Sequence, residues 1–569
     1  MKEQITVSLL LESYKTWVEK DEIQFLRGDP KGNILKYIDA LISIMKLEEQ
    51  EPEQFEWHKA HQEGRKLWEE LASFALNHID SASKGNSTLF NFLTAATEFE
   101  DILYGVELYY RDHTLHSLWV YIMGEYILRN QLEDVHNDLN WYLYNDIKKD
   151  CDRYSYPESL VKYSEKTERD LTNVVTEYRD AIWCIIALCH DLGYSLAKLS
   201  ALNDKVKAVL KYFDIPDFRH IGYSLDIEHQ YLVSQFLELM AMDVRIVPGE
   251  GYKELEEYEE SKELGELETP EFMRRIEELS KCTDKPEFLK KLEEKTLIKC
   301  YRDDATYWLL CRALEKKQHG ILSSYLIYKI LGIFADASVR GPAEEWGLDD
   351  EEAKENIIRG DILFAIAQHE FEFAYLDKLS SLADILVLAD ELEEFSRHGR
   401  ELLSRKYYPT MAYSQVTFKR RDSEDKKFIR IEIVYEVKEP RNLIDFFILK
   451  AERLCRLYSL DENVEKSEFR IIEEIRMTTK KIKDSHEFSL SITLNRDPDK
   501  TKVLLPKNKD VPHVKGGYKF KCYDDKIHVF PKGKDISLSN WFRSLDGDYN
   551  ERGWIEEKNK WVDVAAFKE

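Results

Sequence analysis

Apolar residues recur every three or four positions through most of the first 400 residues, which is the spacing of helices with one buried face. In the first 90 residues this spacing predicts helices over Leu9–Trp17, Ile34–Leu47 and Trp57–His78. His58 and His61 lie among many charged residues on the last of these, so we expect them at the surface. Beyond residue 90 the same spacing predicts a longer series of helices: Phe90–Leu103, Leu115–Leu128, Leu171–Cys189, Ile227–Met242, Ala305–Leu314, Ile321–Phe334, Ile357–His369 and Leu379–Phe395.

The spacing of apolar residues changes to two after about residue 405. Apolar and mostly polar side chains alternate from Ile429 to Val437, as they do in a half-buried strand, and Tyr413–Phe418 is the expected hairpin partner. Residues 442–458 have the spacing of an amphipathic helix, and 488–494 alternate again as a strand. The sequence therefore predicts strands, a helix and further strands in this part of the chain.

We expect three parts in this chain of 569 residues. These are an N-terminal helical region over 1–94, a helical domain over 95–404, and a smaller C-terminal α+β domain of unknown role over 405–569. Only 22 glycines and 14 prolines are present, which favours long helices and a mainly α fold class. A highly charged insert at about 249–298 interrupts the middle part, and we interpret it as a solvated helical excursion.

The formal net charge of −26 argues against bulk binding of nucleic acid or of an anionic membrane surface. The eight cysteines include no CxxC pair, which is typical of a reducing compartment. No apolar run reaches about 18 residues, so we expect a cytoplasmic protein that does not cross a membrane. The composition leaves a homo-oligomer open.

The stretch from Ala181 to Lys198 carries the first sign of chemistry. An apolar run is followed by a histidine and an aspartate, His190 and Asp191, and then by Leu-Gly-Tyr, where we expect the helix to end. A charged pair at the buried end of a helix needs partners, because burying an unpaired charge is costly. Imidazole nitrogen and carboxylate oxygen are both good ligands for divalent metal ions, so a metal is one such partner.

Four other histidines and aspartates lie at or within the apolar helices of the middle part. His116 begins one helix, His319 precedes another, and His369 ends a third, while Asp390 lies inside the apolar run LADILVLADELEEF. Each of them alone is more often a core residue satisfied by a neighbour. Together with His190 and Asp191 they give the order H…HD…H…H…D.

This ordered set resembles the HD-domain superfamily of metal-dependent phosphohydrolases, in its binuclear branch. The resemblance covers about 95–404. The matching pieces are His116-Ser117 before an apolar helix, His190-Asp191 with Leu192-Gly193, His319-Gly320 with Ser323, and Asp390 in a Leu-Ala-Asp-Glu-Leu run.

The resemblance implies an HD-type helical bundle that holds two divalent transition-metal ions per chain, such as Mn or Fe, with Mg, Zn and Ni as further options. Its ligands would be His116, His190, Asp191, His319, His369 and Asp390, with Asp191 bridging the ions. A hydroxide held between the ions would then attack phosphorus in a small phosphorylated substrate of nucleotide type, cleaving a phosphate ester, anhydride or phosphodiester.

Four basic residues near these ligands are candidates for contact with the substrate. His113 precedes His116 by one helical turn, and we interpret it as a catalytic or substrate-contacting residue. Lys198 lies seven residues after Asp191, where a phosphate-binding and catalytic lysine would suit such a site. Arg111 and Arg397 are further candidates for phosphate binding, because guanidinium can bind phosphate through two hydrogen bonds.

Two other functions stay open at this point. The sequence HDLGY lacks the continuation typical of deoxynucleotide triphosphohydrolases and the HDIGK and GYP signatures of cyclic-di-GMP phosphodiesterases. A non-catalytic signalling or scaffold protein that is stabilised by metal would need the same ligands. So would a di-iron oxygenase of the HD type.

Overall fold

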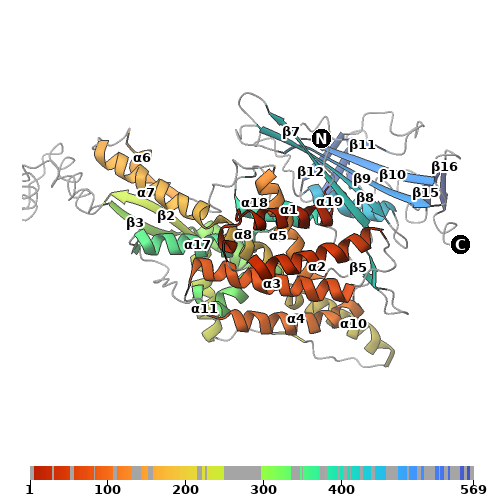
Figure 1. Cartoon of the computed structure of the whole chain (residues 1–569), viewed down its shortest axis with the longest axis horizontal. Coiled ribbons are helices and arrows are strands. Elements are labelled where there is room, and N and C mark those ends of the chain that lie inside the picture. The colour runs from red at the N-terminus through yellow and green to blue at the C-terminus, as the bar shows by residue number, and fades with distance from the viewer. Residues whose placement is uncertain are drawn as a thin grey trace, which may run out of the picture.

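We analysed a computed structural model of the chain (Figure 1). The structure describes residues 5–28, 31–50, 57–81, 84–106, 112–130, 143–151, 158–213, 221–223, 227–248, 296–334, 346–348, 350–371, 379, 381–393, 398–400, 407–409, 412–422, 427–437, 443–455, 472–483, 486–495, 502–504, 519–523, 526–530, 536–537, 552–555 and 560–563.

Helices predominate in this described part, as the spacing of apolar residues predicted, and the sheets are small. The N-terminal helices are α1 (Val7–Glu19), α2 (Lys31–Gln50), α3 (Trp57–Ile79) and α4 (Asn86–Val106). The middle part of the chain contains α5 (His113–Asn130), α6 (Asp146–Lys149), α7 (Glu158–Glu177), α8 (Arg179–Cys189), α9 (Tyr194–Ala197), α10 (Leu199–Leu210), α11 (Ile227–Met240), α15 (Asp304–Glu315), α16 (His319–Ile330), α17 (Asp350–Gln368) and α18 (Leu382–Leu392).

Helices α5 and α8 form the centre of the helical part, with α1 and α3 packed on one or both of them. Every residue of α8 is buried, and so is α5 from His113 to Leu128. Gly124 of α5 lets the two helices approach closely, because a Cβ there would overlap the Trp183 ring of α8. The Trp183 indole N–H donates to the Tyr121 carbonyl at 3.1 Å. One expected helix, 171–189, is in fact two, because α7 ends at Glu177 and α8 begins at Arg179.

A four-stranded sheet inside the helical part was not predicted. Its strands β1 (Leu143–Asn145), β2 (Met242–Pro248), β3 (Thr296–Arg302) and β4 (Trp346–Leu348) are paired in that order. Met242 was expected to end a helix, but α11 stops at Met240, and buried residues alternate from Met242 to Ile246. Residues 296–298 of the expected insert belong to β3, and the rest of that insert lies outside the described residues.

The C-terminal part contains strands and a helix, as predicted. Its main sheet has the order β11-β10-β9-β8-β7, and α19 (Leu443–Cys455) connects the parallel neighbours β8 and β9. Figure 1 shows this sheet at the opposite end of the molecule from β2 and β3. The strands of this part are β5 (His398–Arg400), β6 (Tyr407–Pro409), β7 (Ala412–Asp422), β8 (Lys427–Val437), β9 (Ile472–Lys483), β10 (His486–Asn495), β11 (Lys502–Leu504), β12 (Lys519–Tyr523), β13 (Lys526–Phe530), β14 (Ile536–Ser537), β15 (Arg552–Ile555) and β16 (Lys560–Asp563).

Among the described residues, one stretch, Arg179–Leu210, is long and apolar enough to cross a membrane. Most of its apolar part is buried inside the fold, and core helices of soluble proteins can be equally long and apolar. The three-part division of the chain stays a prediction.

Candidate metal centre

All six predicted ligands lie together at the centre of the helical part. They come from five places in the chain: the first turn of α5, the end of α8, the start of α16, the end of α17, and α18. Their nitrogen and oxygen atoms form three overlapping groups that could each hold a metal ion: His116 with His190 and Asp191, His190 with His369 and Asp390, and Asp191 with His319 and His369. Their role as ligands stays a prediction.

The first side of the cluster is built around His116, which is completely buried on α5. Its Nε2 lies 2.9 Å from Asp390 Oδ1 and 3.4 Å from Asp191 Oδ2. His190 Nε2 lies 3.5 Å from the same Asp191 oxygen and 4.0 Å from Asp390 Oδ1. Two imidazole nitrogens thus face oxygens of two carboxylates.

The second side uses the other oxygen of Asp191. His319 Nε2 lies 3.0 Å from Asp191 Oδ1, and His369 Nε2 lies 3.9 Å from it. The two Nε2 atoms lie 3.0 Å apart. Asp191 therefore presents one oxygen to each side, which is the arrangement that a carboxylate needs in order to bridge two ions.

The Nδ1 atom of each of the four histidines has a partner outside the cluster. His116 Nδ1 lies 2.5 Å from Glu393 Oε2, and His319 Nδ1 lies 2.9 Å from Glu370 Oε2. His190 and His369 instead use backbone carbonyls in the preceding helical turn, Ala187 O at 2.8 Å and Ile366 O at 2.6 Å. Because an N–H at Nδ1 suits each of these acceptors, each Nε2 is left with a lone pair directed at the centre.

The arrangement of these atoms fits a metal ion better than a closed hydrogen-bond network. Among the described residues, the buried Nε2 of His190 has no hydrogen-bond partner. The Nε2 atoms of His319 and His369 lie 3.0 Å apart while both Nδ1 atoms face acceptors, so either a proton or a metal ion is needed between these nitrogens and Asp191. Neutral imidazoles with a few carboxylates are a suitable donor set for Mn, Fe or Zn.

The charge balance of the cluster also favours added positive charge. Burial lowers the pKa of His190 to about 4, because the charged ring loses its hydration. Burial acts to lower the pKa of His319 as well, but Asp191 and Glu370 outweigh it and raise that pKa to about 10. Burial raises the pKa of Asp191, yet the surrounding histidines hold it well below its usual range. Asp191 is therefore a carboxylate anion that could serve as a ligand of a metal ion.

The glycines beside the ligands bring the helices close enough to form one site. The Gly193 N–H donates to Ser323 Oγ at 2.7 Å, and the Ser323 hydroxyl donates to the His319 carbonyl at 2.8 Å. A Cβ at Gly193 would lie 2.5 Å from that carbonyl oxygen. On the other side, a Cβ at Gly320 would lie 2.7 Å from the Ile366 carbonyl. Larger residues at either position would push α16 away from Asp191 or His369.

Two of the predicted substrate contacts are at the site. His113 Nε2 lies 3.9 Å from Asp191 Oδ2, and its ring stacks on Tyr194. Lys198 is half-buried, with its Nζ over the Tyr194 ring at 4.8 Å from the centroid. The other two candidates, Arg111 and Arg397, lie outside the described residues.

Five residues near the cluster were not predicted to be there. His61 was expected at the surface, but it is half-buried, and its Nε2 lies 3.7 Å from the buried carboxylate of Asp112. Asp112 also accepts the backbone N–H of Leu115 at 3.0 Å and so caps the start of α5. The others are Tyr194, Glu370 and Glu393. Glu370 follows His369 directly and Glu393 follows Asp390 by three residues, which are the signals that could have identified them.

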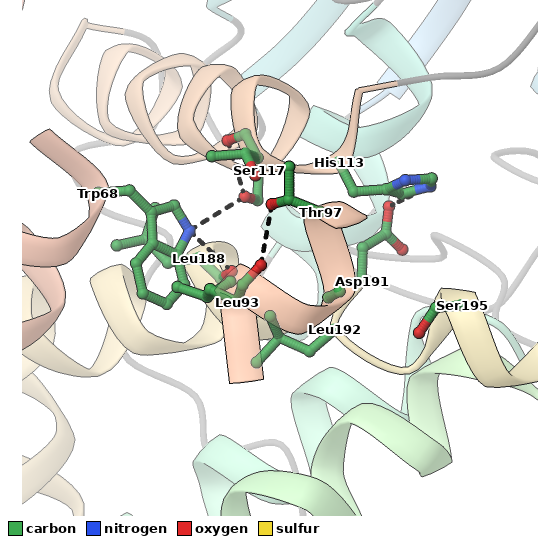
Figure 2. A pocket seen from close by; sticks show the side chains of 11 residues that line it. Trp68, Leu93, Thr97, His113, Ser117, Leu188, Asp191, Leu192 and Ser195 are labelled. Carbon is green, nitrogen blue, oxygen red and sulfur yellow. Dashed lines mark hydrogen bonds and ion pairs between the residues drawn. The ribbon is translucent and has the colours of Figure 1, made fainter. Parts of the chain in front are cut away.

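A pocket opens beside Asp191, between α3, α4 and α5 (Figure 2). Its wall includes Trp68, whose indole N–H donates to Ser117 Oγ and to the Leu188 carbonyl, both at 3.2 Å. His113 and Asp191 face each other at one end of the pocket. Of the six candidate ligands, Asp191 lines this pocket.

No protein-family model matches the chain, and neither a curated protein nor a solved structure is significantly similar to it.

Proposed function

We propose that the protein is a phosphohydrolase with two divalent metal ions, built on an HD-type helical bundle. The observation that supports it most is the division of Asp191 between two pairs of histidines, His116 with His190 on Oδ2 and His319 with His369 on Oδ1. A single-ion site would have no use for the second pair. The order of the six ligands along the chain adds support through the resemblance described above.

When bound, the ions would supply Lewis acidity and lower the pKa of water at the site. The chain's own residues would do the rest. Asp191 and Asp390 bring only two carboxylates to the cluster, so the loaded site would keep net positive charge for an anionic substrate. His113 would exchange a proton with the reacting group from beside Asp191, and Lys198 would bind a phosphoryl oxygen.

The substrate class that we propose is a small phosphorylated molecule of nucleotide type, reached from the pocket of Figure 2. The net charge of −26 disfavours a nucleic-acid polymer as partner. A reducing, cytoplasmic setting is part of the same proposal, because the buried cysteines Cys184, Cys189 and Cys300 are free thiols.

The test is elemental analysis of protein purified without chelators. Wild type should hold about two transition-metal ions per chain, the His369→Ala variant about one, and the His190→Ala/Asp191→Ala double variant none. A screen of phosphate esters, anhydrides and diesters with Mn or Fe then measures release of phosphate or of the product alcohol.

Each other outcome favours a different function. Two ions without hydrolysis, together with oxygen uptake that depends on iron, would replace the proposal with an oxygenase. Metal that is lost only on unfolding, with neither reaction, would favour a scaffold that the ions stabilise. Equal metal content in wild type and in the double variant would refute the metal centre itself.

A further inference from the structure

Tyr194 connects three residues that belong to the candidate site. Its ring stacks on His113 with centroids 4.0 Å apart and an angle of 35° between the planes. It meets the edge of His319, with centroids 5.4 Å apart. Lys198 Nζ lies over the same ring, 4.8 Å from the centroid. One aromatic side chain thus touches a group on α5, a group on α16 and a cation on its own short helix.

The backbone explains why Tyr194 can make these contacts. The Tyr194 N–H donates to the Asp191 carbonyl at 3.0 Å, so the ring follows the carboxylate by one tight turn. The Lys198 N–H donates to the Tyr194 carbonyl at 3.2 Å, which places both side chains on the same side of α9. The lysine needs this help, because its long side chain has many rotamers and gains fixed direction only from a contact.

The place of these three side chains in the fold bears on function. His113 lies 3.9 Å from Asp191 Oδ2 and also lines the pocket that opens beside that carboxylate. Tyr194 is half-buried rather than enclosed in the core, and Lys198 is half-buried too. A ring whose face attracts a cation can therefore fix the ammonium group of Lys198, and the same ring contacts His113 and His319.

We infer that Tyr194 is a positioning residue, whose ring holds Lys198 where the phosphoryl group of the substrate reaches the cluster. The inference rests on the proposed function, because it assigns the phosphate-binding cation of that same site. It makes the ring, and not the hydroxyl, of Tyr194 the required feature. A phenylalanine should therefore replace it, and an aliphatic residue should not.

The first experiment measures the geometry without any ligand. Lysines of metal-free protein are reductively methylated with ¹³C-formaldehyde, and the Lys198 signal is assigned by its loss in Lys198→Arg. The ring current of Tyr194 should shift this signal upfield in wild type and in Tyr194→Phe, and the shift should vanish in Tyr194→Leu. Tyr144→Leu is the matched control, since Tyr144 on β1 makes the same kind of contact with Lys149, at 5.9 Å. It should leave the Lys198 signal unchanged.

The second experiment measures binding of inorganic phosphate to manganese-loaded protein by titration calorimetry. Tyr194→Leu should weaken binding by about three- to fivefold, which is the usual strength of a partly exposed cation–π contact. Tyr194→Phe and Tyr144→Leu should stay within about twofold of wild type. In a Lys198→Gln background, Tyr194→Leu should have no further effect, because the ring acts through the lysine.

The outcomes separate this inference from the function on which it rests. A Lys198 signal without an upfield shift in wild type overturns the inference alone. The same holds if Tyr194→Leu binds phosphate as tightly as wild type, or if Phe is as damaging as Leu. Wild-type protein that holds two ions but binds no phosphate would overturn the proposed phosphohydrolase as well. Circular dichroism of each variant checks that the fold is retained.

Discussion

Helices α5 and α8 carry a buried cluster of charged residues at each end of their contact, and the two clusters are built in opposite ways. At one end, Arg129 bonds Glu125 at 2.7 Å and Asp180 at 2.9 Å, and Arg179 bonds Asp180. At the other end lie the histidines and carboxylates around Asp191. The first cluster contains its own permanent cations, and the second contains none among its six residues.

The difference lies in whether the positive charge in each cluster is permanent. Guanidinium groups stay charged at any physiological pH, so the arginine cluster is neutralised within the chain. The Gln24 N–H donates to Asp180 at 2.9 Å, so this cluster also attaches the segment after α1 to α8. The histidine cluster has no such permanent cation: its positive charge depends on protonation of His319 or on a metal ion that the residues could hold.

The largest expected effect is on metal content. Asp191→Ala should remove both ions, because its two oxygens face both pairs of histidines, while helical content by circular dichroism stays close to wild type. Asp180→Ala, the same change in the arginine cluster, should leave about two ions per folded chain. If Asp191→Ala kept its metal, the contrast between the two clusters would disappear.

The next largest effect is on stability, and here it is the arginine cluster that matters. Asp180→Ala removes the closest carboxylate of buried Arg179 and one of the two carboxylates bonded to Arg129, so the free energy of unfolding should fall by about 3–5 kcal/mol. Chemical denaturation of metal-free protein measures it. Lys162→Ala, which removes an exposed ion pair with Glu158, is the control and should change nothing measurable. Equal stability of Asp180→Ala and wild type would show that the arginine cluster holds nothing together.

A smaller effect is expected from the carboxylates behind the histidines. Glu393→Gln keeps the size of the side chain but weakens the bond to His116 Nδ1, so metal affinity should fall about 10–100-fold. Competition with a fluorescent chelator measures this affinity. Glu391→Gln, on the last turn of the same helix, is the matched control. An unchanged affinity would mean that the 2.5 Å contact does not orient His116.

The smallest effect is the dependence of stability on pH. Burial acts to raise the pKa of Asp180, but the combined effect of Arg179, Arg129 and the Gln24 N–H is larger, so the pKa is lowered. A carboxyl group whose pKa is lower in the folded chain than in the unfolded chain stabilises the fold at pH values above its unfolded-state pKa. This contribution is lost as the pH falls through its folded-state pKa. Burial raises the pKa of Glu125, which acts with the opposite sign.

The Asp180→Asn variant isolates the first of these two contributions. Below about pH 4 its free energy of unfolding should fall less steeply with decreasing pH than that of metal-free wild type. Chemical denaturation between pH 3 and 7 gives both curves. Parallel curves would mean that Asp180 has the same pKa in the folded and unfolded chain.

The sequence predicted which side chains come together because five of the six candidate ligands lie where an apolar helix begins or ends, while Asp390 lies inside α18. His190 and Asp191 could be recognised in this way, and so could His319 before α16. The carboxylates Glu370 and Glu393 were missed although each lies within three residues of a predicted ligand, because the histidines that they contact belong to other helices. His61 was misjudged for the same reason, because Asp112 reaches it from another helix.

Helices and strands could be predicted where the spacing of apolar residues stayed the same over many positions. This holds for the helices and for β8, and helices predominate as expected. The sheet of β1 to β4 did not, since β1 and β4 have three residues each and β2 looks like the end of α11. Short strands hold few alternating positions, so their pairing is decided by distant parts of the chain.

The hydrogen bond between Gly193 and Ser323 joins two residues that are 130 positions apart, and this has a consequence for the order of assembly. A ribosome adds about 5–20 residues per second, so Ser323 is made roughly 7–26 s after Gly193. During that interval His190 and Asp191 exist without the helices that supply His319, His369 and Asp390. The nascent chain can therefore complete its first helices early, but the six side chains of the cluster can come together only after synthesis has passed all of these residues.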